Sequence, residues 1–265
     1  MIITGRKIFV IITGASRGIG RQIALSLASD VAGDSAFLLL ARNGALLEKV
    51  KQEIQELNPT ARVATIVADL SVDKPVEQLD ELVSSIADGQ NAEARLIFHN
   101  AGSLGDLSKP AHALGSAEDW HKYLQANFVS MVTLNHQLFQ LLNKDDGVPL
   151  FVVNVTSLAS VMPMPSLTQY CVGKAAREAY FRNLAVEAKN VRVLNYSPGP
   201  VETDMIHEIF DHTYDADFKE KFAPNAAPSN VHRKRLTPKE TVSKLIAILD
   251  KNEFESGSRI DYFDI

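Results

Sequence analysis

The stretch Ile8-Phe-Val-Ile-Ile-Thr-Gly-Ala-Ser-Arg-Gly-Ile-Gly20 joins an apolar run to a glycine-rich turn. Its β-favouring residues predict a buried strand, and Gly14, Gly18 and Gly20 predict a tight turn into a helix. The free N–H groups of such a turn can bind a pyrophosphate. The spacing is not G-x-G-x-x-G, so a plain strand-to-helix connection is the alternative. The position of the turn, after the first strand, favours dinucleotide binding.

The same alternation of strand and helix patterns continues along the chain. Apolar runs occur at 8–13, 36–41, 62–68, 95–100, 150–156 and 191–197. Between them, apolar residues recur at helical spacing, as in Leu47, Val50 and Ile54. Runs that are apolar on both faces fit strands sandwiched between helices. We predict an α/β fold, a single domain over residues 1–265, with a Rossmann-like doubly wound parallel sheet of about seven strands and helices on both faces.

The bulk composition excludes several classes of protein. The chain has 265 residues, 46% of them hydrophobic, and a net charge of -5, so it lacks the basic footprint of a nucleic-acid-binding protein. No apolar stretch reaches the length of a membrane span, and the run at 8–12 is too short for a signal peptide. The histidines form no metal-binding motif. Cys171 is the single cysteine, so we expect a cytoplasmic protein without metal.

A second constellation lies around Gln169-Tyr-Cys-Val-Gly-Lys174. If this segment is helical, Tyr170 and Lys174 project from one face, and Ser157 lies thirteen residues before the tyrosine. A nearby ammonium would lower the pKa of the phenol, so Tyr170 could donate a proton to a carbonyl during its reduction. Ser157 could then hydrogen-bond the substrate oxygen. A buried structural tyrosine is the alternative.

The second predicted strand ends in Leu40-Ala-Arg-Asn43, without the carboxylate that selects NAD. Arg17 and Arg42 could together hold a 2′-phosphate, which favours NADP(H), although either alone could be a plain exposed arginine. Asp69 could accept from the adenine amino group or cap the next helix. Asn100-Ala-Gly102 could leave room for a ribose or form a plain β-turn.

Residues 202–236 are polar and include Pro224, Pro228 and the basic run His232-Arg-Lys-Arg235. They follow a predicted strand end, where open α/β sheets bind ligands. We predict a substrate lid here, with a solvated surface loop as the alternative.

These motifs together resemble the short-chain dehydrogenase/reductase family over nearly the whole chain. The resemblance rests on the glycine-rich turn at residues 13–20, on His99-Asn-Ala-Gly102, on Asn127 and Ser157, and on the pair Tyr170 and Lys174. It implies an NADP-dependent oxidoreductase in which Asn127 steadies a water that reprotonates the lysine. It also implies a homodimer, paired through the helical segments near 116–143 and 166–188.

Within that family, the motifs at 101–106, 170–177, 191–200, 203–205 and 256–264 are similar to those of members that reduce pterin side-chain carbonyls. That similarity implies a small-molecule pterin substrate and the final step of tetrahydrobiopterin synthesis. Asp261 is then the implied anchor of the pterin ring, with Asp264 as the competing candidate and a solvated tail acid as the alternative for both. A broad carbonyl and diketone reductase and a non-catalytic NADP(H) sensor are the rival functions.

The resemblance also implies three sets of site residues. The catalytic residues are Ser157, Tyr170, Lys174 and Asn127. The substrate-binding residues are Ser157, Leu158, Tyr170, Gly199 and Asp261. The NADP(H)-binding residues are Gly14, Ala15, Ser16, Arg17, Gly18, Ile19, Gly20, Arg42, Asn43, Asp69, Leu70, Asn100, Ala101, Gly102, Tyr170, Lys174, Pro198, Gly199, Val201, Glu202, Thr203, Asp204, Met205 and Ile206.

Overall fold

The computed structural model describes residues 1–72, 76, 78–87, 91–223 and 235–264. The strands within these ranges are β1 (Ile8–Thr13), β2 (Ala36–Ala41), β3 (Arg62–Val67), β4 (Ala94–His99), β5 (Leu150–Val155), β6 (Val191–Ser197) and β7 (Arg259–Asp261). The α-helices are α1 (Gly18–Asp30), α2 (Gly44–Leu57), α3 (Leu79–Ala87), α4 (Ala117–Leu124), α5 (Ser130–Leu142), α6 (Thr168–Glu187), α7 (Asp204–His212), α8 (Ala216–Lys221) and α9 (Pro238–Lys251). Three short turns of helix are η1 (Ala111–Ala113), η2 (Gln125–Val129) and η3 (Leu158–Ser160).

The strands form one parallel sheet in the order β3-β2-β1-β4-β5-β6-β7. The chain runs outward from β1 in one direction and then returns to add β4 on the other side of β1. The carboxyl ends of β1 and β4 therefore flank the point where the strand order reverses, which is where sheets of this kind bind ligands. The predicted doubly wound parallel sheet is confirmed.

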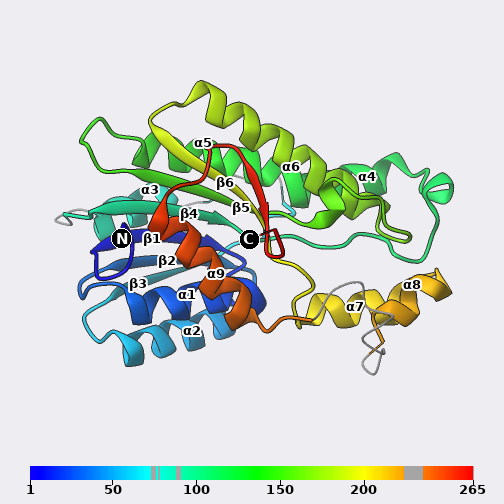
Figure 1. Cartoon of the computed structure of the whole chain (residues 1–265), viewed down its shortest axis with the longest axis horizontal. Coiled ribbons are helices and arrows are strands. Elements are labelled where there is room, and N and C mark those ends of the chain that lie inside the picture. Colours follow the sequence, from blue (N-terminus) through cyan, green and yellow to red (C-terminus); the bar gives the residue numbers. More distant parts are fainter. Residues whose placement is uncertain (73–75, 77, 88–90, 224–234, 265) are drawn as a thin grey trace.

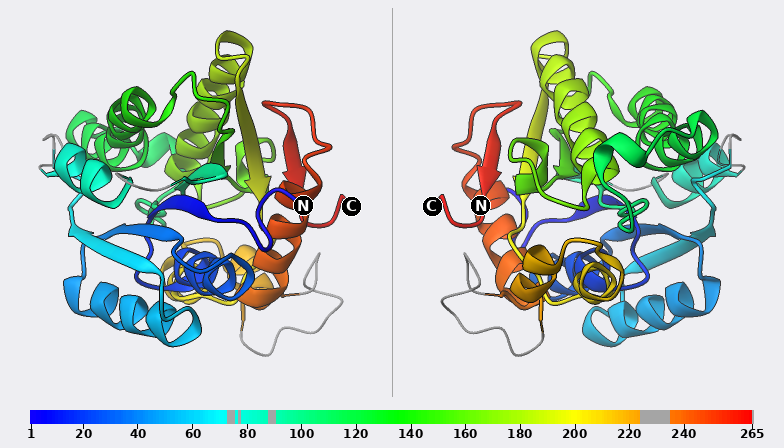
Figure 2. Two further views of the ribbon diagram at one scale, coloured as in Figure 1. Left: turned by 90° about the vertical axis from the view of Figure 1, so that its left-hand side faces the viewer. Right: turned by 90° about the vertical axis from the view of Figure 1, so that its right-hand side faces the viewer.

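Helices cover both faces of the sheet (Figure 1). Helices α1, α2 and α9 share one apolar core with the sheet, and α3, α5 and α6 share the other. Figure 2 shows these two helical layers with the sheet between them. The central strands β1 and β5 are buried along their whole length, as their continuous apolar runs predict.

The outer strands differ from the expectation. Strand β3 was expected to be apolar on both faces, but Arg62 is exposed and Val67 is 65% exposed. The reason is that β3 is an edge strand, which pairs only with β2. At the opposite edge, β7 has only three residues, too few for a recognisable apolar pattern.

The helical segment predicted near 166–188 contains α6, so Tyr170 and Lys174 do lie on one helix. The segment predicted near 116–143 contains α4 and α5, joined by the π-helical turn η2. Asn127 is buried within that turn. A π-turn inside a helix is frequently associated with a functional site, because it redirects the local side chains.

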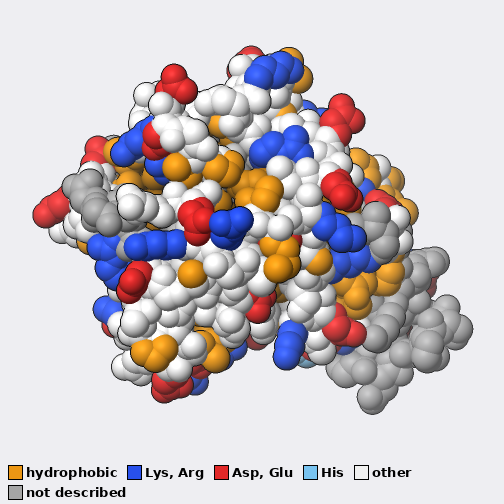
Figure 3. Space-filling view, turned by 60° about the vertical axis from the view of Figure 1, so that its left-hand side comes forward, with side chains coloured by type: hydrophobic (Ala, Val, Ile, Leu, Met, Phe, Trp, Pro, Cys, Tyr) orange, Lys and Arg blue, Asp and Glu red, His pale blue; other side chains and the backbone are white. Residues whose placement is uncertain are grey.

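In the described part of the chain, none of the helices has the length and apolar character needed to cross a bilayer. On the face drawn in Figure 3, Lys and Arg side chains are interspersed with Asp and Glu side chains. This distribution agrees with the modest negative net charge of -5.

Candidate active site

The glycine-rich turn between β1 and α1 has the backbone shape that a phosphate site requires. Gly14 and Gly18 have φ angles of +66° and +56°, a region that favours glycine. A Cβ on Gly20 would lie 2.2 Å from the carbonyl oxygen of Gly14, so only glycine permits this turn. Arg17 precedes α1 without a side-chain cap, which leaves the first N–H groups of the helix available to an anion.

Asn100 ties this turn to the end of β4. Its Nδ2 donates to the carbonyl oxygens of Thr13 (3.1 Å) and Gly14 (3.2 Å). In return, Thr13 Oγ1 accepts from the N–H groups of Asn100 (3.0 Å) and Ala101 (3.1 Å). The two strand ends at the topological switch point are therefore held as one rigid edge.

The predicted 2′-phosphate ligands both lie on the surface. Arg42 is exposed at the end of β2, and Arg17 Nη1 forms a 2.5 Å ion pair with Asp204 Oδ2 at the start of α7. Hydrogen bonds from Ser71 are the main cause that lowers the pKa of Asp69, and the charge of Arg42 adds to them. Arg42 and Asp69 therefore share one region of the surface.

The alternative that Asp69 caps the next helix is wrong. Its carboxylate accepts from the N–H (2.9 Å) and hydroxyl (2.7 Å) of Ser71, whereas α3 begins only at Leu79. The contact with adenine stays a prediction.

The structure brings Ser157, Tyr170 and Lys174 together. The Lys174 ammonium lies 5.4 Å from the centroid of the Tyr170 ring and donates a 2.7 Å hydrogen bond to the carbonyl oxygen of Val155. The Ser157 hydroxyl lies close enough to the phenol of Tyr170 to lower its pKa. Tyr170 is 9% exposed and Lys174 is 6% exposed, so this cluster is shielded from bulk water.

The electrostatics of Tyr170 differ from the expectation that Lys174 lowers its pKa. Burial raises the pKa of Tyr170 to about 12, while the hydrogen bond with Ser157 and the charge of Arg177 act in the opposite direction. Burial also lowers the pKa of Lys174 well below its usual range, and Arg177 lowers it further. The charge of Glu178 acts in the opposite direction and raises the pKa of Lys174.

Asn127 is fixed by the segment that follows β4. Its Oδ1 accepts from the N–H of Ser103 (2.7 Å), and its Nδ2 donates to the Ser103 hydroxyl (3.0 Å) and the carbonyl of Tyr123 (3.0 Å). A Cβ on Gly102 would lie 3.5 Å from Asn127 Oδ1 and 3.9 Å from the nitrogen of Lys174. Gly102 thus sits between these two side chains.

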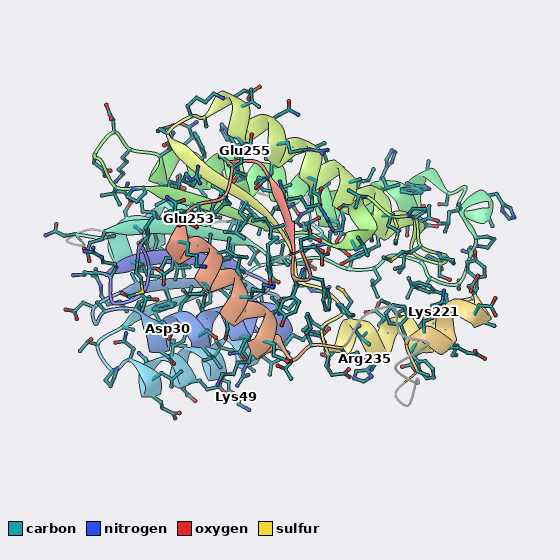
Figure 4. All side chains as sticks on the ribbon, viewed as in Figure 1. Asp30, Lys49, Lys221, Arg235, Glu253 and Glu255 are labelled. Atoms are coloured by element: carbon teal, nitrogen blue, oxygen red, sulfur yellow. The ribbon has the colours of Figure 1, made fainter. Side chains whose placement is uncertain are left out.

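The two ends of the 202–236 segment meet beside the sheet. Val201 forms a β-bridge with Leu236, and Glu202 pairs with Arg235 (2.9 Å) and His207 (3.0 Å). Figure 4 labels Arg235 beside α7. Residues 224–234 lie outside the described part of the chain. They include Pro224, Pro228 and the first three residues of the basic run at 232–235.

Helices α7 and α8 lie within this segment and pack on the reacting side of the site. Ile209 and Phe218 belong to the same buried apolar cluster as Tyr170. The other buried members of this cluster are Leu104, Leu107, Ala159 and Leu167. Tyr214 also donates from its backbone N–H to the carbonyl of Leu107 (3.0 Å). Helices α7 and α8 are therefore packed against the site, and the lid over 202–236 stays a prediction.

The segment that enters α7 also approaches the glycine-rich turn. A Cβ on Gly18 would lie 3.4 Å from the Thr203 methyl group. Gly199 has a φ of +76°, and a Cβ there would lie 3.0 Å from both Leu236 and Phe263. Residues 198–206 therefore run from the end of β6 to the phosphate end of the site.

Asp261 is a buried acid, which excludes the solvated-tail alternative for this residue. It is 1% exposed at the end of β7, and its Oδ2 accepts from the Ser197 hydroxyl (2.7 Å) and lies 3.4 Å from Arg259 Nη2. Its Oδ1 accepts from the N–H of Phe263 (3.1 Å). Asp264 is exposed and accepts from the N–H of Asp261 (3.2 Å).

A cavity of about 400 Å³ lies between the segment after β4 and α4. Asn127 and Gln169 line it, whereas Ser157, Tyr170 and Lys174 do not. The apolar cluster under α7 and α8 fills the space next to the phenol instead. The reacting centre is therefore identified by the side chains of Ser157, Tyr170 and Lys174, and this cavity lies beside it.

Sequence reasoning missed Arg177. It lies on α6 three residues after Lys174 and is 2% exposed. The signal was present, since positions 170, 174 and 177 share one helical face. The sequence alone does not show whether an arginine at this position is buried or exposed to solvent.

Comparison with known proteins agrees with this geometry. The family model described as short chain dehydrogenase matches residues 8–213. The chain is 32% identical to sepiapterin reductase of Rattus norvegicus over 255 residues, which covers 96% of each chain. It is 34% identical to sepiapterin reductase of Xenopus laevis over 258 residues, which covers 97% of this chain and 96% of that one.

Solved structures share the fold. A short chain dehydrogenase from Shigella flexneri, solved in complex with NADP, has a TM-score of 0.75 and 25% sequence identity and covers 98% of this chain and 99% of that one. L-sorbose reductase of Gluconobacter frateurii has a TM-score of 0.79 at 24% identity and covers 98% of this chain and 97% of that one. The family match, the parallel sheet and the grouping of Ser157, Tyr170 and Lys174 agree, so this chain belongs to the short-chain dehydrogenase family of oxidoreductases.

Proposed function

We propose that this protein reduces carbonyl groups on the side chain of a pterin, such as sepiapterin or a 6-pyruvoyl-tetrahydropterin, in the final step of tetrahydrobiopterin synthesis. The protein is an NADP-dependent oxidoreductase. The observation that carries the pterin proposal is the similarity to sepiapterin reductases over nearly the whole chain, at 32% and 34% identity.

The residues present fit NADP(H). The uncapped start of α1 and the glycine-rich turn suit a pyrophosphate, and Arg42 is an exposed cation at the end of β2 that suits a 2′-phosphate. The absence of a side chain at Gly102 leaves space in front of Lys174 for a ribose. When bound, NADPH supplies a hydride to the carbonyl carbon of the substrate.

The side chains of the buried cluster then have separate roles. Tyr170 donates its proton to the carbonyl oxygen, which completes the alcohol, and Ser157 hydrogen-bonds that oxygen as negative charge develops on it. Lys174 holds the nicotinamide ribose. Asn127 steadies a water through which the lysine regains a proton.

Asp261 is the proposed anchor of the pterin. The ring and exocyclic nitrogens of a pterin present a guanidine-like edge, which a carboxylate can bind through two hydrogen bonds. Asp261 lies beside Ser197. Ser197 precedes Gly199 by two residues and lies shortly before the proposed lid at 202–236. Because the carboxylate is buried, a hydrogen bond to it is worth more than one in water.

The substitution Asp261→Asn tests this assignment. It should lower kcat/KM for sepiapterin by about 10²-fold, which corresponds to a lost charge-assisted hydrogen bond, and leave a small diketone largely unaffected. The readout is NADPH consumption with both substrates, and Asp264→Asn is the matched control. Equal losses on both substrates, or a selective loss in Asp264→Asn instead, would contradict the pterin anchor.

A broad carbonyl and diketone reductase is the second candidate. It is favoured by the partners that the Asp261 carboxylate already has, Ser197 and Arg259 among them, and by the apolar cluster around Tyr170. Under this function, Asp261→Asn would spare both substrates. A non-catalytic NADP(H) sensor is the third candidate. NADPH consumption that is abolished by Tyr170→Phe would exclude it.

We also propose that the chain is one domain, with residues 202–236 as its substrate lid, and that it acts as a cytoplasmic homodimer. The packing of α7 and α8 against Tyr170 supports the lid. The free cysteine Cys171 is compatible with a reducing compartment. Sedimentation of the purified protein tests the dimer.

A further inference from the structure

Glu178 is a buried carboxylate on α6 that contacts the turn carrying Ser157. It is 2% exposed, and its Oε1 accepts from the hydroxyls of Thr156 (2.6 Å) and Ser160 (2.5 Å). Thr156 directly precedes Ser157 in the chain, and Ser160 ends η3 three residues after it. One carboxylate oxygen therefore holds this turn on both sides of Ser157.

The Ser160 hydroxyl also contacts Ser157 itself. Its Oγ lies 2.7 Å from the carbonyl oxygen of Ser157 and 2.5 Å from Glu178 Oε1, so its single O–H is shared between these two acceptors. The Ser157 Oγ in turn accepts from the N–H of Ala159 in η3 (3.2 Å). The position of the Ser157 hydroxyl therefore depends on the shape of η3, which Ser160 and Glu178 hold.

Arg259 on β7 extends these contacts from Glu178 to Asp261. Its Nε lies 3.3 Å from Glu178 Oε1 and has no hydrogen-bond partner in the described part of the chain, so this contact is an ion pair. Its Nη2 donates to Asp261 Oδ2 (3.4 Å), which also accepts from the Ser197 hydroxyl (2.7 Å). The guanidinium thus lies between two buried acids, one next to the Ser157 turn and one at the end of β7.

This chain of contacts joins two places where the proposed substrate would be held. The carbonyl oxygen of the substrate would contact Ser157, and the pterin ring would contact Asp261. Both must be met at once for hydride transfer, and a misplacement of about 1 Å can lower a rate by about 10²-fold. Side chains that hold the two contacts at a fixed separation therefore affect turnover without touching the substrate.

We propose that Glu178 is a positioning residue of this site, which holds the Ser157 turn through Thr156 and Ser160 and, through Arg259, fixes the separation of Ser157 from Asp261. This inference deepens the proposed function and rests on the roles proposed there for Ser157 and Asp261.

The carbonyl end is tested by Ser160→Ala, because the charge of Glu178 also raises the pKa of Lys174 and is left in place by this change. Ser157 then loses the shared hydrogen bond to its carbonyl oxygen. We expect kcat to fall by about 10-fold for both sepiapterin and a small diketone, with the dissociation constant for NADPH unchanged. Ser85→Ala on α3 is the matched control and should change neither, since it removes an equivalent bond to the carbonyl three residues back (3.0 Å) outside the site.

A double-mutant cycle shows whether Ser160 acts through Ser157. In the Ser157→Ala protein, Ser160→Ala should lower kcat no further, because the hydroxyl that it positions is already gone. The melting temperature should fall by the same amount in both backgrounds. An equal fold-loss of kcat in both backgrounds would make Ser160 and Glu178 merely structural and overturn the proposal.

The ring end is tested by Arg259→Met, which keeps an apolar stem and removes the guanidinium. The value of kcat/KM should fall by about 10-fold for sepiapterin and by less than about 3-fold for the diketone, which does not reach Asp261. Arg62→Met on the edge strand β3 is the matched control for an exposed arginine. If Arg259→Met does not fold, Arg259→Lys should give a smaller loss with the same selectivity. Equal losses on both substrates, or no loss on either, would contradict the link between Glu178 and Asp261.

The proposed function fails on other measurements. An Asp261→Asn protein that keeps full activity on sepiapterin would remove the pterin anchor, and a fully active Tyr170→Phe protein would remove the proton donor. The Ser160 cycle is also measured with the diketone, so its result remains decisive if the pterin anchor is wrong. The two failures are therefore distinguishable.

Discussion

The phosphate end and the reacting end of this site are built on opposite principles. At the phosphate end, backbone geometry provides the binding surface, and the charged side chains Arg17 and Asp204 are 63% and 68% exposed. At the reacting end, Lys174 is 6% exposed and Arg177 is 2% exposed. Charges in water are screened and interact weakly, whereas buried charges interact strongly and shift pKa values. Equal chemical changes should therefore have unequal effects at the two ends.

The largest effect is expected from Tyr170→Phe at the buried end. The ring still packs in its cluster, but no proton can be given, so kcat should fall by about 10²- to 10⁴-fold with the dissociation constant for NADPH unchanged. Tyr214→Phe, the same change at a 45% exposed tyrosine, is the control and should have no effect. Single-turnover hydride transfer by Tyr170→Phe at the rate of the parent would show that Tyr170 is not the proton donor and would contradict the contrast between the two ends.

An intermediate effect is expected from Arg42→Ala at the exposed end. The loss of an arginine contact to a charged phosphate should weaken NADPH binding by about 10- to 100-fold and leave NADH binding nearly unchanged. Fluorescence titration with both nucleotides measures this, and Lys49→Ala on α2, an exposed side chain, is the control. If NADPH and NADH weaken equally, Arg42 does not read the 2′-phosphate.

The smallest effect is expected from Asp204→Asn, which breaks the ion pair with Arg17. Because both partners are exposed, the free energy of unfolding should change by less than about 1 kcal/mol, as urea denaturation would measure. NADPH binding should tighten slightly at low salt, since Arg17 then has no competing carboxylate. A loss of more than about 2 kcal/mol would mean that this pair supports the fold and that the contrast between the two ends is less sharp.

Local spacing was enough to predict much of this protein. The strands from β1 to β6, the helix carrying Tyr170 and Lys174, and the glycine-rich turn each depend on residues that are close in sequence. Periodicity and the conformational freedom of glycine act over a few residues, so the sequence contains their full signal.

Other features were decided only by the tertiary structure. Exposure of β3 depends on its place at the sheet edge, and the raised pKa of Tyr170 depends on the packing of α7 and α8 around it. Asp261 and Arg177 read as ordinary charged residues in the sequence, but both are buried among partners from other elements. Burial and dielectric environment are properties of many distant residues acting together, and for that reason local patterns do not specify them.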